Sequence, residues 1–362
     1  MKVPPISGRK VYQFRMEPTE LEALELERTA SVARHIYNWA LARCQEYYQQ
    51  HGKRMPGGQL SAELTQLKQT EWWLYDFDSQ MLQQVLADLR RAYINFFERR
   101  AKFPRFKTKK RSRPAFRIKQ RVSVAGERVY VPSVGWVRIR QSQAIEFPTK
   151  SATFKRSAAG HWFVMLVVEF EVPTTKAPVR QEEAAGFDMV LQPPNFLVDS
   201  EGGEIPAPRF YRARERKLRR AQRHLSRARR DSRNRAKARR RLAQVHERTA
   251  NLRQEFLHQL SHLIVATWSV ICFENVNLKS LAKTKHAKSW SDAAFGELLR
   301  QVEYKALWNS KRTSSRSVDS FHPPSCARNA DTRTTSFRSP SRSGLALGVE
   351  PTTCRTGTPP KT

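Results

Sequence analysis

Two acidic residues occupy positions that a metal site built on a β-sheet would require. Asp188 lies within the predicted strand AAGFDM, and Glu274 ends the predicted buried strand SVICFE. Carboxylates that converge from separate parts of one sheet can hold Mg²⁺, a hard ion that prefers oxygen ligands. Two such ions about 4 Å apart activate water and stabilise the leaving oxygen of a phosphodiester. Each acid alone is also compatible with a cap or a turn, so only the pair favours this chemistry.

The cysteines and histidines do not predict a second metal site. Cys44, Cys272, Cys326 and Cys354 lack the close spacing of a zinc knuckle, and nothing indicates a disulfide framework. Cys44 and Cys272 lie among apolar residues and are predicted to be small core side chains. The histidines are scattered at helical or strand positions and are interpreted as structural.

Two segments carry basic residues in patterns typical of nucleic-acid binding. Residues 103–118, FPRFKTKKRSRPAFRI, interleave cations with phenylalanines, and two prolines prevent a regular helix. The cations can contact phosphates while aromatic rings stack on bases, although the phenylalanines could equally lie in the core. After Pro208 the chain is Arg-rich to about Val245, which predicts two long helices that turn near Asp231–Asn234 and lie beside a polyanion. The predicted nucleic-acid-binding residues are Arg105, Lys107, Lys109, Lys110, Arg111, Arg113, Arg212, Arg216, Lys217, Arg220, Arg227 and Arg230.

The overall charge supports an anionic partner. The 362 residues include 66 Lys and Arg against 33 Asp and Glu, a formal net charge of +33. Such a charge opposes compaction, and phosphate backbones are its commonest partner. No apolar run approaches the roughly 20 residues that span a bilayer, and the N-terminus lacks the apolar stretch of a signal peptide. We therefore expect a cytoplasmic, nucleoid-associated protein of the prokaryotic type.

The remaining pattern predicts an α+β multi-domain protein. KVYQFRM alternates like a half-buried strand, and Thr19 with Glu22 forms a capping-box pattern before a helix to about Gln50. Its apolar stripe is predicted to contain Leu21, Leu24, Val32, Ile36, Trp39 and Ala40. A second helix covers SQMLQQVLADLRRAYINFFERR. Short alternating runs up to residue 172 predict antiparallel strands in a barrel or sandwich, followed by the linker VPTTKAPVRQEEA.

Several of these motifs, in this order, resemble those of TnpB/OrfB-type transposon proteins. GFDMVLQPPNFLVDSEGG resembles their first RuvC motif, ICFENVNLKSL their second, and AKSWSDAAFGELLRQVEYKALW the helix that follows. FPRFKTKKRSRPAFRI is similar to their basic N-terminal signature, and HIYNWAL to their first helix. The resemblance covers about residues 9–308.

The resemblance implies a fold, an activity and partners. Family members combine an N-terminal β-barrel carrying a helical insertion with a RuvC-like, RNase H-fold α/β domain and a zinc ribbon. They bind a transposon-derived guide RNA, cut the target DNA that the RNA addresses, and are related to type V CRISPR effectors. Asp188 and Glu274 would be the first two ligands of Mg²⁺ or Mn²⁺. Val190 departs from the family, which has a smaller residue two positions after the aspartate.

The resemblance ends after Trp308. The family continues with a strand, a zinc ribbon and a final Asp in a D-x-N-A-A segment, whereas the tail here is rich in Ser, Thr, Arg and Pro and is predicted to be disordered. If the DNA that encodes HPPSCARNAD is translated in another reading frame, it can encode the pattern P-x-x-L-C-x-x-C-G, which is one half of a zinc ribbon. SGLALGVEPTTCRTGTPPKT likewise permits W-x-C-P-x-C-G-T and D-x-N-A-A-x-N. We infer a frameshift between about Trp308 and Phe321, which leaves the missing aspartate where Arg355 and Thr356 stand.

Three domains follow from this interpretation. They are residues 1–178, the N-terminal barrel with its helical insert; 179–310, an incomplete RuvC-like domain with an Arg-rich hairpin; and 311–362, an aberrant tail. Without the zinc ribbon and the third carboxylate, the chain is expected to bind RNA and DNA but to cleave poorly or not at all. Asp319 and Asp331 in the tail are not assigned as ligands. Two alternative functions are a non-catalytic basic RNA- or DNA-binding protein and a strand-joining transposase. No His-and-Tyr site of the kind that a strand-joining transposase uses is found in the sequence. The alternative to a frameshift is a genuinely divergent tail.

Overall fold

The computed structural model describes residues 6–120, 122–172, 184–190, 195–274, 276–281, 283–309 and 312–314. These residues belong to one compact unit, Met1–Arg316, which contains two sheets. The predicted linker falls almost wholly outside the described residues, as does the tail beyond residue 314. Among the described helices, none is both long and apolar enough to cross a membrane.

The first sheet is antiparallel and has the strand order β2-β6-β7-β1-β5-β4-β3. Its long central strands, β1 and β7, pair from Ile6 with Val172 to Arg15 with Phe163. The edge strands β2 and β3 are not hydrogen-bonded to each other within the described residues, so the predicted barrel is not closed. The strands are β1 (Ile6–Met16), β2 (Ala115–Ile118), β3 (Val124–Ala125), β4 (Arg128–Val131), β5 (Gly135–Arg140), β6 (Thr149–Arg156) and β7 (Trp162–Val172).

Helices inserted between β1 and β2 share one apolar core with this sheet. They are α1 (Glu20–His51), α2 (Gly57–Thr70), the 3₁₀ helix η1 (Trp72–Asp76) and α3 (Ser79–Phe97). The predicted capping box is present, because the Thr19 Oγ1 accepts from the Glu22 N–H and the Glu22 carboxylate accepts from the Thr19 N–H. The prediction was wrong for Leu21 and Leu24, which are 78% and 62% exposed, since the buried face of α1 instead begins at Leu26.

The second sheet is mixed and has the order β10-β9-β8-β11-β12. Strand β11 is parallel to both β8 and β12, whereas β8, β9 and β10 form antiparallel pairs. The predicted irregular tail was therefore wrong at Arg312–Ser314, where three residues without an apolar pattern gain backbone hydrogen bonds from β11. The strands are β8 (Ala184–Met189), β9 (Asn195–Asp199), β10 (Glu204–Pro206), β11 (Val270–Phe273) and β12 (Arg312–Ser314).

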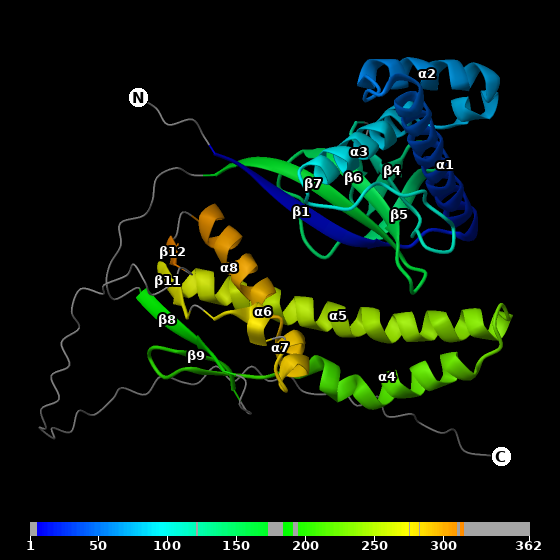
Figure 1. The fold of residues 1–362 in the computed structure, drawn as a ribbon. Coiled ribbons are helices and arrows are strands. Elements are labelled where there is room, and N and C mark those ends of the chain that lie inside the picture. The colour runs from blue at the N-terminus through cyan, green and yellow to red at the C-terminus, as the bar shows by residue number, and fades with distance from the viewer. Residues whose placement is uncertain are drawn as a thin grey trace, which may run out of the picture. The chain divides into compact units, whose positions relative to one another are not determined.

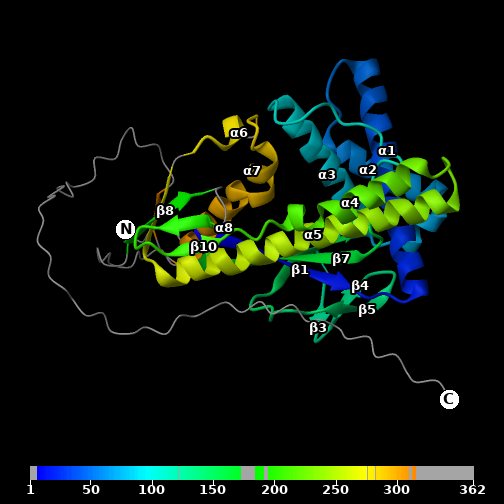
Figure 2. The same ribbon diagram turned by 90° about the horizontal axis from the view of Figure 1, so that it is seen from below.

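Two long helices, α4 (Phe210–Arg227) and α5 (Arg233–Thr267), connect β10 to β11. They lie side by side as a hairpin in both views (Figures 1 and 2). The turn lies slightly before the predicted position, and Ser232 caps α5 by accepting from the Arg235 N–H at 3.1 Å. The predicted helix over 287–308 is divided at Ala294, which has a positive φ of 53°. The remaining helices are α6 (Leu278–Leu281), α7 (Ala287–Ala293) and α8 (Phe295–Trp308).

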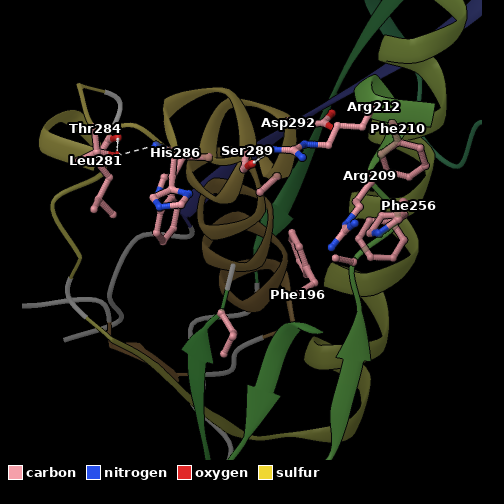
Figure 3. Close-up of a pocket in the computed structure, with 15 residues that line it drawn as sticks. Phe196, Arg209, Phe210, Arg212, Phe256, Leu281, Thr284, His286, Ser289 and Asp292 are labelled. Atoms are coloured by element: carbon pink, nitrogen blue, oxygen red, sulfur yellow. Dashed lines mark hydrogen bonds between the residues drawn. The ribbon is translucent and has the colours of Figure 1, made fainter. Parts of the chain in front are cut away.

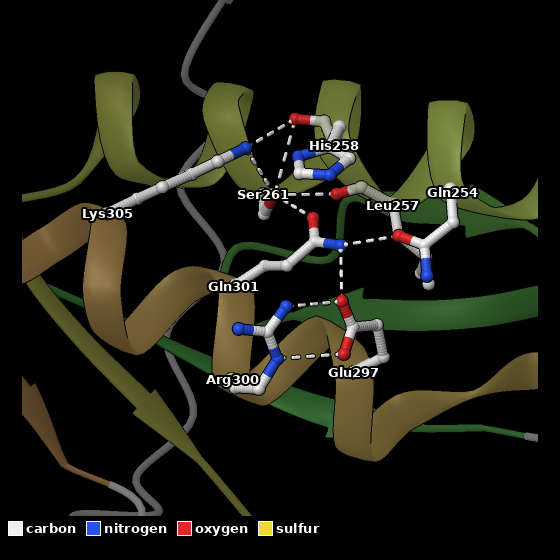
Figure 4. A network of polar contacts seen from close by, with 8 residues as sticks. All are labelled: Gln254, Leu257, His258, Ser261, Glu297, Arg300, Gln301 and Lys305. Carbon is white, nitrogen blue, oxygen red and sulfur yellow. Dashed lines mark hydrogen bonds and ion pairs between the residues drawn. The ribbon is translucent and has the colours of Figure 1, made fainter. Parts of the chain in front are cut away.

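Helices α5 and α8 pack on the second sheet and are joined by a buried polar network (Figure 4). The fully buried Ser261 donates to the Gln301 Oε1 at 3.0 Å, and the Gln301 amide donates to Glu297 at 3.0 Å. The Lys305 Nζ donates to the Ser261 Oγ and to the His258 carbonyl, each at 2.7 Å. Because the polar atoms of Ser261 and Gln301 have partners, these two neutral side chains can lie within an apolar core at little cost.

Candidate active site and nucleic-acid interface

Asp188 and Glu274 lie together at the same end of neighbouring parallel strands. Phe187 in β8 is opposite Phe273 in β11, and the Glu274 N–H donates to the Phe187 carbonyl at 3.2 Å. The next residue of each strand therefore carries a carboxylate. Both acids are exposed. Their neighbours Phe187 and Phe273 stack in the core with ring centroids 5.3 Å apart, which fixes the two strand ends.

The two carboxyl groups affect each other electrostatically. A hydrogen bond with Asp188 raises the pKa of Glu274, and slight desolvation and the Asp188 charge act in the same direction. Two carboxylates in such proximity repel one another unless a proton or a cation lies between them. Their oxygens are the donor type that Mg²⁺ and Mn²⁺ prefer, so the pair fits a divalent ion.

The described residues do not supply a third acid to this pair. They contain no group of three or more His, Cys, Asp or Glu side chains placed to hold a metal. Asp319, Asp331 and the position of Arg355 and Thr356 lie outside the described residues. Cys44 and Cys272 are half-buried free thiols, and burial raises the pKa of Cys44, consistent with a packing role.

The α4–α5 hairpin carries a groove lined by cations. Its part near the base has a volume of about 480 Å³ and its part near the turn about 680 Å³. Neither part is lined by a carboxylate. The predicted binding residues include cations of α4 and of the turn, whereas the cations contributed by α5 were not among them. The basic lining residues are Arg214, Lys217, Arg220, His224, Arg227, Arg229, Lys237, Arg241 and Arg248.

The base of the hairpin is anchored to α7 by one acid and one hydroxyl. The buried Asp292 accepts hydrogen bonds from the Tyr211 N–H and from Arg253, each at 2.9 Å. The first of these gives a partner to a backbone N–H in the first turn of α4 that has none within the helix. Arg212, predicted to bind nucleic acid, donates to the Ser289 Oγ at 2.8 Å. These contacts join residues tens of positions apart, and no local sequence pattern indicates them.

The predicted binding residues of the 103–118 segment are exposed, but they are not equivalent. The Lys107 Nζ lies over the Tyr37 ring, 3.6 Å from its centroid, and partial desolvation lowers the pKa of Lys107. The Lys107 backbone exchanges hydrogen bonds with the Asn38 amide at 2.7 and 2.9 Å. Lys107 therefore stabilises the loop against α1. Of the phenylalanines, Phe116 is buried, whereas Phe106 is 52% exposed.

Comparisons with known proteins identify the family. The chain is 32% identical over 319 residues to the "Putative RNA-guided DNA endonuclease InsQ" of Escherichia coli (strain K12), covering 83% of this chain and 78% of that protein. A "Putative RNA-guided DNA endonuclease" of Streptomyces pristinaespiralis is 33% identical over 309 residues, covering 83% and 75%. This chain belongs to the TnpB/OrfB family.

Family models agree with this membership, and one solved structure has a similar fold. Residues 166–285 match the OrfB_IS605 model, described as "Probable transposase", and residues 8–53 match its "Helix-turn-helix domain". In the structure, the second range contains β1 and a single continuous helix, α1. The Cas12f1 chain of a cryo-EM complex with sgRNA and target DNA has a similar fold, with a TM-score of 0.50, 12% identity and coverage of 82% of this chain and 73% of that chain.

Proposed function

We propose that this chain binds a guide RNA and DNA, and that it descends from RNA-guided, metal-dependent DNA endonucleases. The proposal depends on one observation, the meeting of Asp188 and Glu274 at the ends of β8 and β11. The basic hairpin is inserted between β10 and β11 of the same sheet, so cations for phosphate contact belong to the same fold as the acids. The names of the two curated relatives support the same function.

The strand pattern supports a RuvC-like, RNase H-fold assignment for residues 179–310, with residues 1–178 as the N-terminal nucleic-acid-binding domain and 311–362 as the aberrant tail. Strand β8 is antiparallel to β9 and parallel to β11, and the acids stand on β8 and directly after β11. The Asp188 and Glu274 carboxylates would hold a divalent ion, which when bound activates water and neutralises phosphate charge. The hairpin cations would hold the phosphate backbone and orient the strand toward these acids.

Catalytic impairment is part of the proposal. Two carboxylates hold metal more weakly than three, because each ligand contributes negative charge to the site. Within the part of the chain that the structure describes, a third acid does not join Asp188 and Glu274. This observation favours a second candidate function, that of a non-catalytic basic RNA- or DNA-binding protein.

A cleavage assay with a matched chain tests the proposal. The purified protein with its transposon-end RNA should bind target DNA and cut it poorly or not at all in Mg²⁺. A chain whose reading frame is restored after Trp308 should cut the same DNA, and Asp188→Ala in that chain should abolish cutting. Robust cutting by the present chain, lost on Asp188→Ala, would contradict impairment but keep the site. Cutting by the restored chain that survives Asp188→Ala would contradict the site itself.

A further inference from the structure

A separate cavity lies between the second sheet, the start of α4, and α6 and α7 (Figure 3). Its volume is about 570 Å³, within the range of about 300–1,000 Å³ that small-molecule ligands occupy. Val190, two residues after Asp188, forms part of its wall. The cavity therefore adjoins the strand that carries the first acid, and it is distinct from the hairpin groove.

Four aromatic side chains line one part of the cavity wall. The Phe256 ring packs edge-on against Phe196 at 5.5 Å between centroids and against Phe210 at 5.7 Å. Trp290 contributes a fourth ring from α7 and packs on Phe295. Rings that are held in place by one another offer a fixed apolar surface at low entropic cost. Such a surface suits a flat aromatic ligand.

Two arginines lie beside these aromatic rings. Arg209 and Arg212 line the cavity, and the Arg209 side chain extends into it beside Phe256 (Figure 3). Asp292 is the single acid in the lining, and its charge is already matched by Arg253. Arg209 makes no ion pair with any of the residues described here. The electrostatic environment of the cavity therefore favours an anion next to the aromatic ligand.

Arg209 also has an unfavourable backbone conformation. Its φ of 43° lies in the left-handed region, which residues with a Cβ rarely adopt. As the N-cap of α4 it provides no side-chain cap, a task that Asp292 performs from α7 instead. A glycine would meet the backbone requirement better. Strain of this kind, at a residue whose cation faces a cavity, is typical of binding sites.

We propose that this cavity accepts an unpaired base of the DNA strand that approaches Asp188 and Glu274. The base stacks on the Phe256 ring and contacts the inclined Phe210 ring at its edge, and the Arg209 guanidinium holds its phosphate. The proposal rests on the function proposed above and adds a subsite to it. A paired base cannot enter, because its ring faces are covered by neighbouring base pairs, so the cavity selects single-stranded DNA.

Binding of short oligonucleotides tests the subsite without requiring cleavage. At about 0.3 M salt, which weakens phosphate contacts, the full chain should bind oligothymidylate about ten-fold more tightly than an abasic strand of equal length, the difference expected for one stacked base. Phe256→Leu keeps an apolar side chain but removes the ring, and it should abolish this preference. Phe210→Leu at the edge of the cavity should act in the same way. A thermal melt checks that each variant is folded.

Arg209→Gly separates binding from folding. It should weaken binding of both strands by about five-fold, roughly the contribution of one phosphate contact to affinity. The melting temperature should stay equal or rise, because glycine relieves the backbone strain at this position. Arg99→Gly is the matched control, since Arg99 has a φ of 56° and the same charge but lies outside the cavity. It should leave oligothymidylate binding unchanged.

The outcomes distinguish the subsite from the proposed function. Equal binding of base-containing and abasic strands by the wild-type chain would overturn the subsite, as would equal weakening of both by Phe256→Leu. Neither result affects cleavage by the frame-restored chain, which depends on Asp188. A base preference that persists in Asp188→Ala supports the subsite even if no cutting is found.

Discussion

The α4–α5 hairpin and the 103–118 segment are both rich in basic residues, yet their cations have different surroundings. In the hairpin, the groove-lining Lys217, Arg220 and Arg227 have no acidic partner among the described residues. In the segment, Lys107 lies on the Tyr37 ring. A basic run in a sequence is therefore a mixture of structural and free cations, and tertiary contacts decide which are which.

Removal of the free hairpin cations should give the largest effect. Replacing Lys217, Arg220, Arg227 and Arg241 with Ala should weaken nucleic-acid binding on the order of 100-fold. The slope of log K against log salt concentration should become shallower by about three, close to the value for the loss of four phosphate contacts. Electrophoretic mobility shifts across a salt series measure both quantities.

A matched control removes the same charge elsewhere. Arg9, Arg138, Arg140 and Arg156 each form an ion pair with a glutamate on or near the first sheet. Their replacement with Ala should change the slope of log K against log salt concentration by less than about one, because cations that are already paired with glutamates contribute little to counterion release when nucleic acid binds. Equal losses in the two quadruple variants would show that net charge, and not the hairpin, determines affinity.

Lys107→Ala should have a smaller effect, on stability more than on binding. Loss of the contact with the Tyr37 ring should lower the free energy of unfolding by about 1 kcal/mol, measured by urea denaturation. The neighbouring Lys109→Ala should leave stability unchanged and weaken nucleic-acid binding instead. If both variants lose affinity equally and keep full stability, the two lysines are equivalent and the distinction fails.

Lys305 is half-buried, so its effect should appear in the pH dependence of stability and not in nucleic-acid binding. Burial lowers its pKa from 10.5 to about 8. Between these values the unfolded chain binds the proton more tightly than the folded chain, so stability should rise as pH increases from about 8 to 10.5. Lys305→Met should lack this rise, whereas the exposed Lys150→Met should retain it. Chemical denaturation at several pH values measures the slope, and identical slopes in all three proteins would contradict the account.

Features that are encoded locally could be predicted from the sequence. The Thr19–Glu22 capping box, strand β8 with Asp188, and strand β11 directly before Glu274 have short-range patterns, and the structure contains them. The three-residue strand β12 has no such pattern, because its partner β11 supplies the hydrogen bonds. The Asp292–Arg253 pair and the open first sheet likewise depend on contacts between residues distant in sequence. No periodicity encodes them.

Metal binding tests the central claim most directly. Titration of Mn²⁺ into the purified chain, followed by electron paramagnetic resonance, should show bound ion in the wild type and in Glu201→Gln, an exposed control in a turn of the same sheet region. Asp188→Asn and Glu274→Gln should each lose it, because the site depends on both carboxylates. Unchanged Mn²⁺ binding in Asp188→Asn would contradict the assignment of these two acids as one metal site.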